Sequence, residues 1–241
     1  MEGIQIFGTH QWQLANIESI FAILNSETLI NTWIAMAILL GLGALGRYLI
    51  LYKKDTVAGF ITKKIVVNFM DLIEQSIGKF SFNYFAFITS IFLFIIACNW
   101  IALIPELEEP TKDLNTTLAL AIVTFIYIQI ASIKKNGIGS YIHHYFSPFA
   151  PMVFLNIIGE LATIMSLSFR LFGNIFGGSI IVTMYNKAVS GSIIGHVITS
   201  IFGIPFIITA FFIIFEGFLQ AFVFSIISLT NLALLVQEEP K

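Results

Sequence analysis

The sequence predicts an all-α polytopic membrane protein with five membrane-crossing helices and one amphipathic helix on the cytoplasmic surface. Of its 241 residues, 57% are hydrophobic, only 11% are charged and 25 are Phe. A soluble domain carries about 25% charged residues, so this chain could not cover itself with polar surface in water. Several apolar runs approach or exceed the roughly 20 residues that a helix needs to cross the hydrocarbon core. These observations predict a single integral membrane domain over residues 1–241.

The N-terminal segment, residues 1–28, contains no Lys or Arg. It also lacks the basic region followed by an apolar core that marks a cleaved signal peptide. The first crossing is expected at residues 29–52, and it contains "GLGALG", Gly41–Gly46. This stretch matches G-x-G-x-x-G, but no strand precedes it and no acidic residue follows about twenty positions later. Small residues that let helices approach closely are the better interpretation.

The amphipathic surface helix is predicted at residues 56–79. Polar residues at i, i+4, i+7 and i+11 form one stripe: Lys64, Asn68, Asp71 and Gln75. The opposite face is apolar. Such a helix lies in the plane of the membrane surface rather than crossing it.

The second and third crossings are expected at residues 84–104 and 114–133, and loop charges give their orientation. The segment between the first two crossings is rich in Lys, and the loop after the third crossing begins with Lys134 and Lys135. The intervening loop, "PELEEPTKDLN", holds four acids and one Lys. Cytoplasmic loops carry the excess of basic residues, so the N-terminus is expected outside and the C-terminus in the cytoplasm.

The last two apolar regions, residues 148–188 and 192–236, are too long for single upright helices. Nearly forty helical residues extend about 57 Å at 1.5 Å per residue, about twice the core thickness. Each region either splits into two crossings or forms one strongly tilted helix. A split would put the second crossing of each pair near Arg170 or Glu216, and neither place has a Pro or a polar turn cluster to form a loop. We therefore expect two long, strongly tilted helices that form a hairpin through "NKAVSGS".

Three ionisable residues fall within these long helices: Glu160, Arg170 and Glu216. Arg170 lies in the stretch "SLSFRLFGNIFGG", and no acidic residue lies within nine positions of it on either side. An Arg at bilayer depth costs about 2.5–3.5 kcal/mol on insertion scales, so such residues are rare and usually functional. Glu160 is about 15 Å away along the helix axis, and Glu216 could pair with Arg170 only if the hairpin packs accordingly. The partner is therefore either Glu216, in a structural ion pair, or a carboxylate of another chain.

Other motifs point to no further chemistry. The single Cys98 excludes an intramolecular disulfide, and His143-His144 lacks the context of a metal-binding H-E-x-x-H motif. The chain has no P-loop motif and no long basic tract. We therefore expect no cofactor, no metal and no nucleic-acid partner.

Two stretches, "LSFRLFGNIFGG" and "GFLQAFVFSIISL", closely resemble the signatures of subunit a of the F-type ATP synthases. The resemblance extends over most of the chain. It implies an ion-translocating, non-catalytic stator subunit without a nucleotide site of its own. It also implies partners: a ring of c subunits with one mid-membrane carboxylate each, the peripheral-stalk b subunits, the other synthase subunits and the lipid bilayer. A bacterial plasma membrane is the expected location.

The resemblance also implies roles for individual residues. Arg170 would stand between two aqueous half-channels and keep each arriving ring carboxylate ionised, so that the carboxylate releases its ion. Arg suits this role better than Lys because its charge cannot be lost by deprotonation. Asn174, which follows Arg170 by one turn, and Gln220 would be polar neighbours of the ring contact.

The half-channel acids depart from the family pattern. Many relatives carry an acid nine residues after the Arg, where this chain has Ser179. Many carry Glu or His seven residues before the Gln, whereas here Glu216 lies four residues before Gln220. Glu160 is likewise displaced by one turn. We therefore expect Glu216 to carry the ion relay of the outer half-channel, with Ser179 and His196 nearer its mouth.

Two other classes of protein stay open. A secondary transporter also uses intramembrane charges, but it typically shows internal repeats and broken helices at matching places, and no convincing repeat is found. A purely structural scaffold would not need Arg170 together with Asn174 and Gln220. Whether the transported ion is a proton or sodium stays open, because the ligands on the ring subunit mainly determine which ion is bound.

Overall fold

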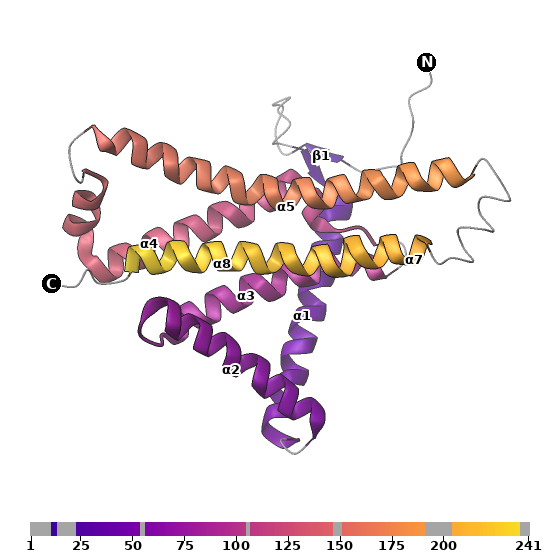
Figure 1. The fold of residues 1–241 in the computed structure, drawn as a ribbon, viewed down its shortest axis with the longest axis horizontal. Coiled ribbons are helices and arrows are strands. Elements are labelled where there is room, and N and C mark those ends of the chain that lie inside the picture. The colour runs from indigo at the N-terminus through magenta and orange to yellow at the C-terminus, as the bar shows by residue number, and fades with distance from the viewer. Residues whose placement is uncertain are drawn as a thin grey trace.

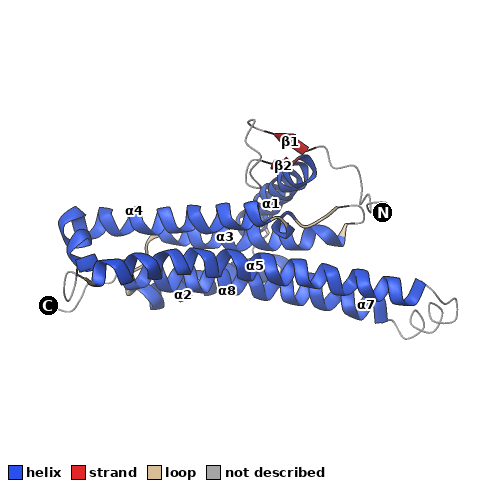
Figure 2. Ribbon diagram, turned by 90° about the horizontal axis from the view of Figure 1, so that it is seen from above, coloured by secondary structure: helices blue, strands red, loops and turns tan. Residues whose placement is uncertain are grey.

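The computed structural model describes residues 11–13, 23–53, 56–104, 107–146, 151–190 and 204–236. Five helices within these ranges are long and apolar enough to cross a membrane: Glu27–Tyr52, Phe82–Leu103, Leu114–Tyr141, Met152–Val189 and Phe206–Val236. They confirm the polytopic helical class that the composition predicted. Four of these helices run side by side along the long axis of the molecule (Figures 1 and 2), and the first one crosses them steeply (Figure 1).

Two very short strands precede the helices. β1 (Gln11–Gln13) pairs antiparallel with β2 (Ile23–Asn25). The pair lies beside the start of the first helix, away from the long helices (Figure 2). Three-residue strands carry too little periodicity to be recognised in a sequence, and the sequence analysis did not predict them.

The end of α1 and the start of α2 approach each other closely. α1 (Ser26–Tyr52) begins three residues before the predicted crossing, and α2 is Val57–Ile77. At Gly59 in α2, an added Cβ atom would lie 2.2 Å from the Lys53 carbonyl oxygen at the end of α1. Only glycine permits this approach of the two backbones.

The amphipathic character of α2 agrees with the prediction. All four residues of its polar stripe are exposed, and Ile73 and Ile77 are buried on another face. These two isoleucines pack in one cluster with Leu229 and Leu232 from the C-terminal helix. The cluster fixes the C-terminal half of α2 against the rest of the molecule.

The core lies among the four remaining long helices. These are α3 (Phe82–Trp100), α4 (Leu114–Phe146), α5 (Met152–Ser190) and α8 (Gly217–Val236). Short 3-10 helices, Ile101–Leu103 and Pro110–Lys112, connect α3 to α4. The most central cluster takes side chains from all four: Ile91, Phe92, Ile95, Ala121, Leu167, Leu171, Ala221 and Phe224.

The helix at the predicted third crossing is longer than the predicted span. The expected end was residue 133, but α4 continues through Phe146 with a sharp kink at Gly137, where φ is 78° and ψ is 159°. Past the kink, the Tyr141 hydroxyl donates a hydrogen bond to Gln129 Oε1 at 2.9 Å. The chain therefore turns back on its own helix, which the charges of Lys134 and Lys135 alone could not reveal.

The long helix α5 agrees with the prediction of one continuous helix rather than two. Its 39 residues are continuous helix, about 58 Å at 1.5 Å per residue, and it is bowed in the view of Figure 1. α1 has 27 residues, about 40 Å, which suits an upright crossing. α1 crosses α5 and α8 steeply in Figure 1, so these helices do not share one direction.

The last predicted helix, residues 192–236, is described only from residue 204 onwards. It consists of α7 (Ile204–Thr209), a π-helix (Ala210–Glu216) and α8. The π-helical segment was not predicted. The predicted hairpin connection "NKAVSGS" begins at residue 186, but α5 continues as helix through Ser190. Residues 191–203, which include the rest of that connection and His196, lie outside the described residues.

Candidate functional site

One face of α5 is buried against its neighbours. Its buried positions recur every three or four residues, as expected of a helix with one packed face: Leu167, Ser168, Leu171, Ile175 and Gly178. On this face the Ser168 hydroxyl lies 3.1 Å from the Thr117 hydroxyl of α4, and both residues are buried. The packed face sets the rotation of the helix, so it also decides which residues point away.

Arg170 points away from this packed face and is exposed. Its guanidinium donates one long hydrogen bond, from Nη2 to Ser166 Oγ at 3.4 Å. Within the described ranges the only ion pair joins Lys112 to Glu108. The structure therefore shows no ion pair from Arg170 to Glu160 or to Glu216, and the structural interpretation of this arginine loses its support.

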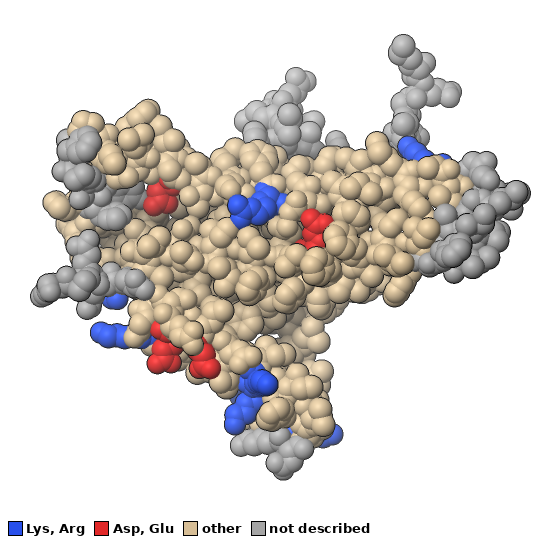
Figure 3. Space-filling model, in the orientation of Figure 1, with Lys and Arg blue, Asp and Glu red and all other residues tan. Residues whose placement is uncertain are grey.

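Small residues surround Arg170 on the exposed side of α5. Added Cβ atoms at Gly159, Gly173 and Gly177 would meet nothing within 4 Å, and Ser166 lies one turn before the arginine. Charged groups over the long helices stand isolated in apolar surface (Figure 3). Because small residues let helices pack closely within a membrane, this open face of α5 can accept another helix directly beside the guanidinium.

The other polar residues of the prediction occupy different positions around this face. Asn174 is partly exposed, one turn after Arg170 on α5. Gln220 is 9% exposed and belongs to the packed face of α8. Glu160, also on α5, is partly exposed. Burial therefore differs among these residues, from the exposed Arg170 to the buried Gln220.

Glu216 is the last residue of the π-helix, and it is partly exposed. Short π-helical segments inside α-helices are frequent at functional sites. Two side chains at the end of α3 donate hydrogen bonds to carbonyl oxygens on either side of Glu216. Trp100 Nε1 donates to Ile214 O at 3.2 Å, and Asn99 Nδ2 donates to Gly217 O at 2.9 Å. These bonds hold the irregular backbone that carries Glu216.

Asn99 itself is held from a third element. The Thr111 hydroxyl donates to Asn99 Oδ1 at 2.7 Å, and both residues are almost fully buried. An added Cβ atom at Gly217 would lie 3.1 Å from Asn99 Cβ, so glycine lets α3 approach closely enough for these bonds. This group of residues was not predicted, although one Asn in the apolar run "FLFIIACNW" was a signal that could have found it.

Replacing Asn99 by Leu tests this support of the π-helix. Asn99→Leu removes two interhelical hydrogen bonds, and such bonds contribute roughly 0.6–1.7 kcal/mol each in membrane proteins. We expect unfolding of the detergent-solubilised chain to need about 1–3 kcal/mol less free energy, with reduced ion transport as well. Ser228→Ala is the matched control, because that buried hydroxyl bonds only within its own helix, to Phe224 O. Equal stability of the two variants would contradict the supporting role of Asn99.

Ser179 lies where α5 comes close to the π-helix. The neighbouring Gly178 faces Phe212, whose ring would come within 2.8 Å of an added Cβ atom. The Ser179 hydroxyl, which is partly exposed, donates to Phe176 O at 2.8 Å within its own helix. The structure thus brings the two helices together one residue before Ser179 and four residues before Glu216.

A carboxyl group that the sequence analysis did not single out lies in the α3–α4 loop. Burial raises the pKa of the Glu109 carboxyl, while its own backbone hydrogen bond and Lys112 act in the opposite direction. The same loop is tied to α1, because Asn31 Nδ2 donates to Glu108 O at 3.0 Å. Glu109 therefore retains a proton to higher pH than an exposed glutamate would.

Fold and site together define a polytopic membrane protein that presents one arginine, without an ion pair in the described residues, on the open face of a long helix. The family model described as the ATP synthase A chain matches residues 29–232, and the chain belongs to the ATP synthase subunit a family. This membership confirms the resemblance inferred from the two sequence motifs.

Several curated relatives align over most of their length. ATP synthase subunit a of Moorella thermoacetica is 36% identical over 211 residues, which cover 86% of this chain and 89% of the relative. ATP synthase subunit a of Desulfosudis oleivorans is 35% identical over 86% of this chain and 87% of its own. ATP synthase subunit a 2 of a Picosynechococcus species is 31% identical, with 88% and 86% covered. Family membership places the chain in the ion-translocating stator of a membrane-bound ATP synthase complex.

Proposed function

We propose that this chain provides two half-channels to the carboxylates of a rotating c-subunit ring, and that Arg170 separates them. The observation that supports this most directly is the exposed guanidinium without an ion pair in the described residues. A cation in an apolar layer requires an anionic partner or water. A carboxylate carried past it by another chain meets that need, and does so only transiently.

The open face of α5 fits such a partner. Its glycines have free space where side chains would stand, so a ring helix can approach the Arg170 backbone closely. The guanidinium can then form charge-assisted hydrogen bonds with the ring carboxylate. Asn174 and Gln220 serve as polar neighbours of this contact.

The arginine prevents a direct leak between the two half-channels. A charge that crosses the membrane releases about 2.3 kcal/mol per 100 mV, and this energy is lost as heat if ions pass without turning the ring. A fixed positive charge repels cations and keeps the nearest ring carboxylate ionised. Ions can therefore pass from one half-channel to the other only when the ring rotates.

Glu216 carries the ion relay of the outer half-channel in this proposal. Its position at the end of the π-helix, held by Asn99 and Trp100, fixes its backbone. Ser179 lies beside the close approach of α5 to this segment and supplies a hydroxyl nearer the mouth, with His196 as a further candidate. Glu160 is a second channel acid.

The peripheral-stalk b subunits, the other synthase subunits and the lipid bilayer complete the surroundings. Nearly every side of α1 carries exposed large apolar residues, such as Trp33 at 69% and Leu40 at 75%. Such a helix needs lipid or partner helices around it. The proposed location is a bacterial plasma membrane, with the N-terminus outside and the C-terminus in the cytoplasm.

Cysteine labelling tests this orientation. In a Cys98→Ser background, we expect Glu108→Cys to react with an impermeant thiol reagent from outside and Lys64→Cys only from the cytoplasm. Both side chains are exposed, so accessibility does not bias the comparison, whereas Cys98 itself is buried. Cytoplasmic labelling at position 108 would overturn the topology.

Copurification tests the assignment to a rotary motor. The tagged chain should carry a ring-forming c subunit and a soluble ATPase head with it out of mild detergent. A secondary transporter or a structural scaffold would purify without either of them. Their absence under conditions in which the other synthase subunits remain assembled would contradict the proposal.

A further inference from the structure

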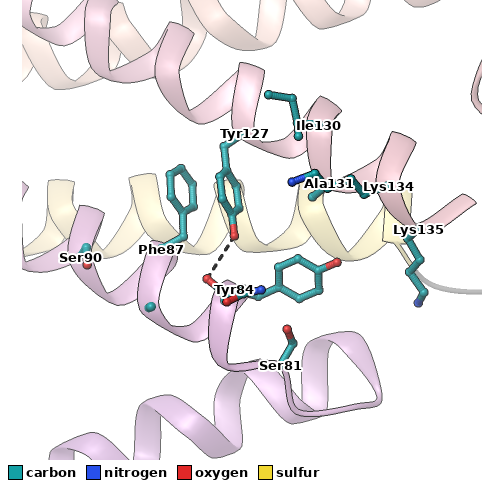
Figure 4. A pocket seen from close by; sticks show the side chains of 11 residues that line it. Ser81, Tyr84, Phe87, Ser90, Tyr127, Ile130, Ala131, Lys134 and Lys135 are labelled. Carbon is teal, nitrogen blue, oxygen red and sulfur yellow. Dashed lines mark hydrogen bonds between the residues drawn. The ribbon is translucent and has the colours of Figure 1, made fainter. Parts of the chain in front are cut away.

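A pocket of about 630 Å³ lies between α3 and α4. It is at the N-terminal end of α3, beside the part of α4 that comes just before the kink at Gly137. Figure 4 shows side chains from both helices around it. None of its lining residues belongs to the arginine site or to the π-helix. The pocket is therefore not part of the proposed ion path. The positive-inside orientation puts this end of both helices at the cytoplasmic surface.

Two lysines of α4 line the pocket, and they differ in their contacts. Lys135 Nζ donates to Val236 O at the C-terminal end of α8, so part of its charge is already used to stabilise that helix end. Lys134 is exposed and has neither a hydrogen bond nor an ion pair among the residues that the structure describes. The pocket therefore has one ammonium group that is available to a ligand.

Hydroxyl groups of α3 and α4 accompany this charge. Tyr127 donates to Asn83 O at 3.1 Å (Figure 4), and its ring stacks on Phe87 with a centroid separation of 3.5 Å. The Tyr84 hydroxyl makes no hydrogen bond within the described ranges, and the side chain of Ser81 does not cap α3, which begins beside it. Both hydroxyls can donate to an anion, as the Lys134 ammonium can.

Polarity changes along the pocket in the direction of the helix axes. Ser81, Tyr84 and Lys134 stand near the ends of the two helices, whereas Phe87 and Ile130 line it about one turn further into the membrane-crossing part. A phospholipid has the same order of groups, with a charged phosphate at the surface and apolar chains below it. Basic pockets between transmembrane helices on the cytoplasmic side are known to suit anionic headgroups.

We propose that this pocket binds an anionic phospholipid, with its phosphate at Lys134 and its acyl chains beside Phe87 and Ile130. The Tyr84 and Ser81 hydroxyls complete the donors around the phosphate. Bound there, the lipid joins α3 to the end of α4 that also holds α8 through Lys135. This site is independent of the ion path proposed above.

Lipid retention by the purified full-length chain tests the proposal. The chain is exchanged into detergent micelles that contain phosphatidylglycerol or phosphatidylcholine, washed, and assayed for retained lipid by mass spectrometry. We expect phosphatidylglycerol to be retained and phosphatidylcholine to be lost. Lys134→Gln should lower the apparent affinity for phosphatidylglycerol roughly fivefold, because one basic residue near an anionic lipid surface contributes about that factor. Lys64→Gln, which removes an exposed lysine of α2 outside the pocket, should leave it unchanged.

Further arms of the experiment separate the possible outcomes. Tyr84→Phe keeps the ring and removes only the hydroxyl, so it should weaken retention even if Lys134→Gln fails to fold. Inorganic phosphate at millimolar concentration should not displace the lipid. Complete displacement by phosphate would identify a site for a soluble anion and overturn the lipid proposal. Equal retention of both lipids, or equal behaviour of Lys134→Gln and Lys64→Gln, would overturn it as well.

Discussion

Arg170→Ala will abolish both ATP synthesis and ATP-driven ion pumping while the complex still assembles. The alanine leaves the two half-channels without a fixed positive charge between them, so ring carboxylates are no longer forced to release their ions. The fold should tolerate the change, because the side chain is exposed and makes a single hydrogen bond of 3.4 Å.

The measurement uses inverted membrane vesicles with the assembled complex. Pumping is monitored by a pH- or sodium-sensitive dye, and assembly by the amount of ATPase head bound to the membrane. Ser166→Ala is a matched control, since it removes the one hydrogen-bond partner of Arg170 and keeps the charge; it should pump at a substantial fraction of the normal rate. Near-normal ATP synthesis by Arg170→Ala would contradict the separating role of the arginine.

Glu216→Gln will reduce ion transport sharply, by about 10²-fold or more if Glu216 acts as a positioned proton-transfer group. Glutamine preserves size and hydrogen bonding, but it cannot exchange a proton or hold a cation by charge. Because the backbone around Glu216 is held by Asn99 and Trp100, the substitution should leave the π-helix in place. Transport is measured in the same vesicles, with assembly verified in the same way.

A second substitution separates the relay from a packing role. Ser179→Glu places a carboxylate beside the contact of α5 with the π-helix. Added to Glu216→Gln, it should restore part of the lost transport, whereas it could not repair a packing defect. The transport rate of Glu160→Gln, which removes an acid elsewhere on α5, is measured for comparison with that of Glu216→Gln. Full transport by Glu216→Gln alone, with normal assembly, would leave the relay without support.

Much of the fold follows from the length and polarity of single segments. The run around Arg170 had no break where a loop could form, and α5 is accordingly one helix, Met152–Ser190. The polar stripe on residues 56–79 predicted α2 within two residues at each end. In both segments the information is local, because hydrophobic periodicity and the cost of a broken helix in lipid depend only on neighbouring residues.

The features that were missed depend on contacts between distant segments. The π-helix at Ala210–Glu216 gives no periodic signal, and its backbone is held by Asn99 and Trp100 of another helix. The kink of α4 depends on Gly137, whose positive φ lets the chain turn back. Neither is visible from local composition alone.

The site shows the same division between local and distant information. Arg170 was recognised because a guanidinium at membrane depth is costly wherever it stands. Its lack of an ion pair in the described residues, and the free space at Gly173 and Gly177, became visible only when α5 was placed against its neighbours. Asn99 and Thr111 were overlooked because each is a single polar residue, and their pairing joins two separate elements.

Site-directed cross-linking to the ring tests most directly whether the open face of α5 meets the c subunits. In a Cys98→Ser background, a cysteine at Gly173, where nothing lies within 4 Å of an added Cβ atom, should form a disulfide with a cysteine near the ring carboxylate. A cysteine at Ile175, on the packed face and 7% exposed, should not. Cross-links from position 175 but not from position 173, or none from either position in an assembled complex, would contradict the account.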